Sequence, residues 1–239
     1  MDDAELLGLV RNLRADGLAP KQIARSLGVG PARVAPLIRM IAEQDAATAP
    51  EPSVVGCWVS GGWSGGLGVD DSDGWPDIAG DSELSSGLVG VVVARERSRH
   101  RGIAVCGYLV DTYCLGVKNA MGPLFMDSNQ LRTYVTRFFE PFEGGSIEAP
   151  IELAQYLVWG ALAYARDLGF EPHHDFASTA DHLGVANGTN PIRFGCDGVP
   201  LYVAGPYDNA GEIMRKLKGK IATGDAHFLV QAPGAFADE

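Results

Sequence analysis

The most chemically suggestive stretch of the chain is a histidine-rich segment, EPHHDFASTADHLG, at residues 171–184. If this segment is helical, His174, Ser178 and Asp181 share one face and His182 lies beside them. Imidazole nitrogens and a carboxylate at this spacing could bind zinc, or could form a base that an acid orients. The metal hypothesis names His174, Asp181 and His182 as ligands, and His174 is also a candidate catalytic residue.

A structural interpretation of the same segment stays open. The segment contains neither an HExxH pattern nor paired cysteines, which are the usual signatures of a zinc site. His173 and His174 could instead lie exposed at the start of a helix, where the negative charge of Asp175 interacts favourably with the helix dipole.

A second candidate site is centred on an acidic residue within an apolar run, Asp111 in GYLVDTYCLGVKN. A carboxylate inside a strand is costly unless it is paired or hydrogen-bonded. Asp111 is therefore either catalytic, with Lys118, Glu96 or His227 as its candidate companions, or a structural carboxylate that holds the glycine-rich segment or accepts an arginine. Cys114 is a candidate nucleophile if a histidine lies beside it, and a buried free thiol otherwise.

Before these candidates the chain begins with a pattern of three short helices. Apolar residues at helical spacing predict the first helix over residues 4–15, which Asp16 and Gly17 end. Pro20 begins the second helix and Gly28 ends it, and Pro31 begins the third. The proline at position 36 predicts that the third helix is kinked or starts late.

The second and third predicted helices carry a specific pattern of small and apolar residues. These are Ile23, Ala24, Leu27, Gly28, Val29, Val34 and Leu37. The pattern resembles the helix-turn-helix of bacterial DNA-binding regulators, with Ala24 at the helix crossing and Gly28 in the turn. The resemblance covers residues 1–45 and implies DNA binding through the third helix, with a homodimer reading two half-sites.

The side chains of the third helix argue for limited sequence readout. If Val34, Leu37 and Ile41 face the core, the opposite face is mostly alanine and proline, whereas base edges are read by hydrogen-bonding side chains. The polar residues available for phosphate contacts are Lys21, Gln22, Arg25, Arg33 and Arg39. Docking of another protein, or dimerisation, is the alternative use of this module.

Residues 46–55 lose all periodicity and contain two prolines among small residues, which predicts a Pro/Ala linker. Residues 56–239 then read as one mixed α+β domain. Its expected elements are a tryptophan-anchored irregular segment over 56–87, β-rich runs at 88–95 and 102–117, and helices near 127–142, 150–170, 172–184 and 208–220. A hairpin around Asp197 and Gly198 and a final strand at 226–230 complete the prediction. The fold class is thus α+β, with a small all-α module preceding the larger domain.

Charge and composition limit the function. The formal net charge is -11, and the first 45 residues are neutral, with six basic and six acidic side chains. Any contact with nucleic acid must therefore be local. No apolar run is long enough to cross a membrane, and the acidic start predicts a cytoplasmic protein without a membrane partner. The four cysteines lack CxxC spacing and are expected to be free thiols.

No sequence motif specifies a cofactor. The stretch SGGWSGGLG lacks the Lys-Ser/Thr ending of a phosphate-binding loop. We therefore expect a DNA-associated regulatory protein whose larger domain senses or assembles. One alternative is an enzyme, for example a metal-assisted hydrolase that uses Asp111, His174, Asp181 and His182. The other alternative is a protein-docking adaptor.

Overall fold

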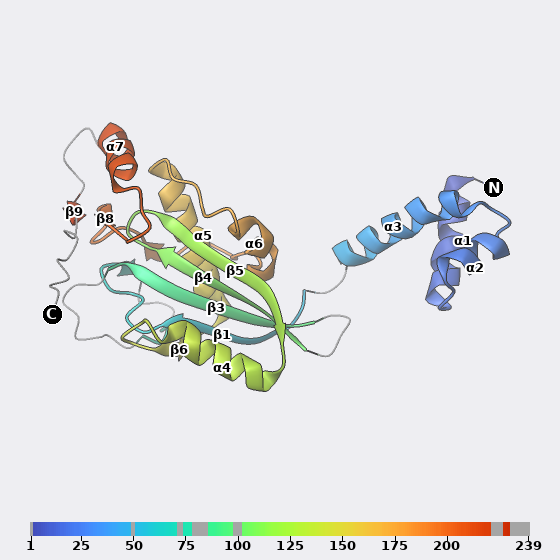
Figure 1. Ribbon diagram of the computed structural model, residues 1–239, viewed down its shortest axis with the longest axis horizontal. Helices are drawn as coiled ribbons and strands as arrows, with labels where there is room; N and C mark the ends of the chain where they lie inside the picture. The colour runs from blue at the N-terminus through green and yellow to red at the C-terminus, as the bar shows by residue number, and fades with distance from the viewer. Residues whose placement is uncertain are drawn as a thin grey trace, which may run out of the picture. The chain divides into compact units, whose positions relative to one another are not determined.

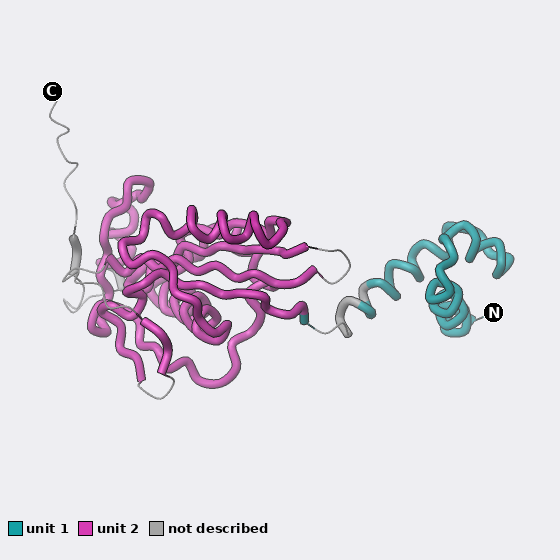
Figure 2. Tube along the Cα trace, turned by 90° about the horizontal axis from the view of Figure 1, so that it is seen from below, with its two compact units in different colours: residues 1–51 teal, residues 52–239 magenta. Residues whose placement is uncertain are grey.

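The computed structural model describes residues 2–48, 51–70, 74–77, 86–97, 102–220 and 227–229. Contacts between residues divide the chain into two compact units, Met1–Glu51 and Pro52–Glu239 (Figure 2). The first unit is helical, and the second combines helices with an antiparallel sheet, so the protein is of the mixed α+β class.

The first unit consists of helices α1 (Asp3–Ala15), α2 (Pro20–Ser26) and α3 (Pro31–Thr48). Gly28, which follows α2, has a φ of +63°, a left-handed conformation that glycine adopts without steric cost. The three helices contact one another around a core of fully buried side chains. These are Leu6, Val10, Ile23, Ala24, Val34 and Ile41.

Helix α3 begins at Pro31, as predicted, and it includes Pro36, so the alternative of a late start is wrong. Proline at position 36 removes one hydrogen bond to the preceding turn, and the burial of Val34 and Ile41 from the same helix offsets this loss. The helix also continues to Thr48, into the predicted linker over 46–55, because alanine favours helix.

The second unit is built on a five-stranded antiparallel sheet with strand order β5-β4-β3-β1-β6 (Figure 1). Its strands in sequence order are β1 (Val54–Ser60), β3 (Leu88–Glu96), β4 (Ile103–Asp111), β5 (Gly116–Met126) and β6 (Ser146–Glu148). Both faces are covered: side chains of β3 alternate between them, with Val91 and Val93 in one apolar cluster and Val92 and Ala94 in the other.

Helix α4 (Ser128–Phe139) covers one face, and α5 (Ile151–Asp167) and α6 (Phe176–Leu183) cover the other. Helix α4 begins with a capping box: the Asp127 carboxylate accepts bonds from two backbone N–H groups, and the Gln130 side-chain oxygen accepts the Asp127 N–H. The apolar helix α5 lies in the core of the unit, as its sequence predicts.

The region 102–117 departs from its prediction as one long β run. The run is interrupted after Asp111, and the chain turns back at Gly116, whose φ is +69°. The added Cβ of any other residue at position 116 would lie 2.7 Å from the Cβ of Ala165 and 3.0 Å from the backbone oxygen of Ala161, both in α5. Gly116 therefore allows the turn to pack directly against α5.

The glycine-rich segment before β3 is held by aromatic and acidic side chains, as far as the structure describes it. Trp63 is buried and donates through its indole nitrogen to the backbone oxygen of Pro76 at 2.9 Å. The carboxylate of Asp77 accepts from the backbone N–H groups of Gly62 and Ser64. Strand β2 (Gly68–Val69) leaves this segment and pairs with β7 (Ile192–Arg193).

The predicted hairpin around Asp197 and Gly198 forms only its turn. Both residues have positive φ, 53° and 80°, and the turn is flanked by a single bridge between Cys196 and Val199. The flanking strands pair elsewhere: β7 with β2, and β8 (Leu201–Val203) with β9 (His227–Leu229) in parallel. Helix α7 (Ala210–Lys220) lies between β8 and β9 in sequence. None of the described helices has the length and apolarity needed to span a membrane.

Candidate functional site

The exposed face of the helical unit presents basic side chains on α2 and α3. Lys21, Arg25 and Arg39 are exposed and form no ion pair among the described residues. Arg33 is also exposed, and it lies 2.7 Å from the carboxylate of Asp3 in α1. The Gln22 side chain accepts a bond from the Ala19 N–H at 2.8 Å and thereby caps α2.

The charge of residues 17–42 is one-sided, although the unit Met1–Glu51 as a whole has seven acidic and six basic side chains. Residues 17–42 contain four basic side chains and no aspartate or glutamate. The acidic residues of the unit precede α2 or follow Ile41 in sequence. Residues 17–42 therefore carry a local positive charge within a chain that is acidic overall.

Asp111 is confirmed as a buried carboxylate, and it lies at the end of β4 rather than inside a strand. Its side chain is 4% exposed, and its Oδ1 accepts the backbone N–H groups of Tyr113 and Cys114, each at 2.9 Å. Burial raises the pKa of Asp111 to about 6, against the lowering effect of these bonds and of Lys118. The carboxylate is thus engaged in closing the β4–β5 turn.

Of the proposed companions of Asp111, Lys118 lies close enough for its positive charge to lower the pKa of that carboxyl. Its Nζ lies 2.8 Å from Oδ2 of Asp208, and both side chains are largely buried, with 16% and 11% exposed. The same oxygen accepts the Gly205 N–H and the Tyr202 hydroxyl. Burial raises the pKa of Asp208, but the bonds from Lys118 and Gly205 outweigh this effect and leave it below its usual value.

The other two proposed companions are placed differently. Glu96 pairs with Ile103 at the opposite end of the β3–β4 ladder from Asp111, which pairs with Leu88. Eight residues of strand separate the two positions, about 26 Å. His227 lies in β9, and its side chain is outside the described part of the chain.

Three of the four thiols are buried. Cys57, Cys106 and Cys114 are at most 2% exposed, and burial raises the pKa of each. For Cys114 the neighbouring negative charge of Asp111 adds to the rise in pKa, which disfavours the thiolate form that a nucleophile requires. Cys196 is partly exposed.

The predicted metal ligands are separated from one another. The imidazole Nε2 of His182 lies 3.1 Å from the backbone oxygen of Val93, whereas Asp181 and His174 are exposed. Among the described residues, the potential metal ligands that lie close together are His174 and its sequence neighbours His173 and Asp175.

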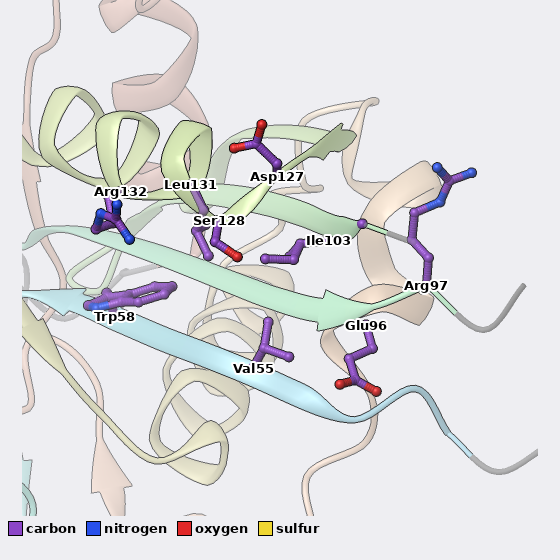
Figure 3. Close-up of a pocket in the computed structure, with 10 residues that line it drawn as sticks. Val55, Trp58, Glu96, Arg97, Ile103, Asp127, Ser128, Leu131 and Arg132 are labelled. Atoms are coloured by element: carbon purple, nitrogen blue, oxygen red, sulfur yellow. The ribbon is translucent and has the colours of Figure 1, made fainter. Parts of the chain in front are cut away.

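An open groove of about 840 Å³ lies where the start of α4 crosses the sheet (Figure 3). Trp58, Ile103 and Leu131 contribute its apolar part, and Arg132 and Glu96 contribute charges of opposite sign. The sequence gives no local signal for this groove, because its residues come from β1, β3, β4 and α4. Arg97, which also lines the groove, lies over the ring of Phe125, 4.2 Å from the ring centre.

No family model, curated protein or solved structure matches this chain. The function must therefore be inferred from the residues and their arrangement.

Proposed function

We propose that this chain is a DNA-associated regulatory protein that binds duplex DNA through α2 and α3. The observation that supports this proposal is the segment 17–42, which has four basic side chains and no acidic ones and which forms a helix, a glycine turn and a second helix. Lys21, Arg25 and Arg39 are exposed and not ion-paired within the described residues, so phosphate can reach them.

The same face favours contact with the DNA backbone over readout of bases. Ala32, Ala35 and Pro36 are exposed on α3 and carry no hydrogen-bonding side chain. Base edges in the major groove are read by donors and acceptors, which here reduce to Arg33 and Arg39. With about three phosphates neutralised, the logarithm of the association constant should fall by about 2.7 for each tenfold rise in salt.

The second unit supplies the acidic charge of the protein, and we assign it a sensing or assembly role. After residue 45 the chain has 24 acidic and 13 basic residues, so this part repels DNA. A hydrolase centred on Asp111 is less well supported, since that carboxylate bonds to its own turn and the side chain of His174 is exposed.

Protein docking through the same helices is the second candidate. Ala32 and Ala35 are exposed on α3, and Met40 is 42% exposed, so α3 presents an apolar strip that a partner helix could cover. This candidate requires no DNA affinity.

Fluorescence anisotropy of the full-length protein with labelled duplex DNA tests the proposal. Binding should occur at low salt and weaken steeply at physiological salt. The triple variant Lys21→Ala, Arg25→Ala and Arg39→Ala should lose most of the affinity, because it removes the unpaired cations. Duplex from the promoter region of its own gene and unrelated duplex should differ by much less than this loss.

A matched control removes the same charge from exposed positions of the second unit. The variant Arg137→Ala, Arg215→Ala and Lys218→Ala also lowers the net charge by three, and should bind DNA nearly as the unchanged protein does. Equal losses in the two variants would mean that net charge alone sets the affinity. No binding of any duplex at low salt would remove DNA from the proposal and leave protein docking.

A further inference from the structure

Three consecutive side chains before α6 bring metal-ligating atoms together. One donor atom each of His173, His174 and Asp175 lies within 4.8 Å of the other two. The two imidazole rings are 4.1 Å apart between centres. Asp175 lies between them: its Oδ1 is 3.2 Å from Nε2 of His174, and its Oδ2 is 3.6 Å from Nδ1 of His173.

The backbone of this segment is fixed from both sides. The His173 N–H donates to the backbone oxygen of Val117 in β5 at 2.9 Å, and the Phe176 N–H donates to the backbone oxygen of His173 at 3.0 Å. The Phe176 ring is buried, 5.3 Å from Trp159 and 6.2 Å from Tyr108 between ring centres. The donor side chains therefore project from a backbone held by the sheet and the core.

The side chains themselves are accessible to an ion. The side-chain exposures are 34% for His173, 82% for His174 and 52% for Asp175. Within the described part of the chain, these three side chains form ion pairs only with one another. A bound cation would therefore displace no other salt bridge.

The donor set selects the class of metal. Two imidazole nitrogens and one carboxylate oxygen suit zinc and its neighbouring divalent transition metals, whereas calcium and magnesium prefer sites made of oxygen atoms. Tetrahedral zinc, with bonds of about 2.0–2.1 Å, places its ligand atoms roughly 3.3 Å apart. Rotations of exposed side chains can draw donors within 4.8 Å to that spacing.

We propose that His173, His174 and Asp175 form a zinc-binding site with three protein ligands and water in the remaining position. The site lies between β5 and the start of α6. It differs from the ligand set that helical spacing suggests, because His182 faces the backbone oxygen of Val93 and Asp181 lies beyond the turn that holds the histidines. The proposal is independent of DNA binding.

Isothermal titration calorimetry of the metal-free full-length protein with zinc chloride tests the site. One equivalent should bind. Each of His173→Ala, His174→Ala and Asp175→Asn should weaken binding by about tenfold or more, since each removes one ligand. The changed residues are not buried, so circular dichroism should show an unchanged fold.

The matched control is Asp181→Asn, the same chemical change at an exposed position six residues away. It should leave the affinity and the one-to-one stoichiometry unchanged, as should His182→Asn. Weakening by the Asp181 and His182 variants but not by His173→Ala would overturn the proposed ligand set. Zinc affinity that none of the ligand variants alters, or no heat of binding, would overturn the site itself.

Discussion

Asp111 shows how a single carboxylate can define a turn at an energetic cost. Its Oδ1 accepts two backbone N–H groups that the end of β4 would otherwise leave unpaired. Its burial raises its pKa from 3.8 to about 6. The folded protein thus binds a proton at the Asp111 carboxyl more tightly than the unfolded chain does. The folded state is therefore more stable when Asp111 is protonated.

This raised pKa predicts a pH-dependent stability. The contribution of Asp111 is complete below about pH 4 and is lost as the pH rises through 6. The variant Asp111→Asn provides the reference, because its amide does not titrate. Relative to this variant, the free energy of unfolding of the wild type should fall by about 1 kcal/mol between pH 5 and pH 7.5, as Asp111 loses its proton. Urea unfolding followed by tryptophan fluorescence measures this difference. Parallel pH profiles for the wild type and Asp111→Asn would contradict the assignment.

At this scale the sequence predicts which residues are unusual better than it predicts their partners. Asp111 stands out from its apolar neighbours, so its burial was predictable. Asp208 bonds to Lys118 across 90 positions, and no local spacing indicates such a pair. The histidine segment illustrates the same limit: a helical face was expected for His174 and Asp181, but α6 begins only at Phe176.

At the scale of elements, one buried arginine ties α6 to the sheet. Arg95 in β3 is 4% exposed. It donates to the backbone oxygens of His182 and Leu183 at the end of α6, and to that of Pro52 before β1. A cation at a helix C-terminus interacts favourably with the helix dipole and with carbonyls that lack a helical partner.

Removal of this guanidinium should loosen α6. Arg95→Met leaves buried carbonyls without a charged donor, and the expected loss of stability is about 3 kcal/mol. Hydrogen exchange followed by mass spectrometry should show faster exchange in peptides covering α6, with β4 less affected. Arg166→Met, at an exposed position of α5, provides the control. Unchanged exchange in α6 would show that Gln155 and Trp159, which also donate to this end of the helix, suffice.

Elements with local signals were predictable and those with distant partners were not. The capping box of α4 and the apolar helix α5 depend on residues a few positions apart. The turn at Asp197 and Gly198 is also local and forms, but its flanking strands pair with β2 and β9 instead of each other. Strand pairing over such separations is decided by packing of the whole unit.

At the scale of the whole molecule, two separate cores predict two separate unfolding transitions. Ile23 is fully buried among α1–α3, and Val91 is fully buried in the sheet. All four tryptophans lie in the second unit. Ile23→Ala should destabilise the first unit by about 2–5 kcal/mol. It should lower the midpoint temperature of the first unit's transition, seen by helical circular dichroism, and leave the midpoint of the tryptophan fluorescence transition unchanged. Val91→Ala should shift the tryptophan transition. A common shift in both signals for Ile23→Ala would mean that the units unfold together.

The burial of the thiols has a practical consequence for labelling. Because Cys57, Cys106 and Cys114 are enclosed in the second unit, only the partly exposed Cys196 is open to a reagent in the native protein. A maleimide dye should therefore add once to the folded chain and four times in denaturant, which intact-mass spectrometry can count. The protein thus provides its own single attachment point for a fluorophore, placed on a turn of the second unit and requiring no engineered cysteine.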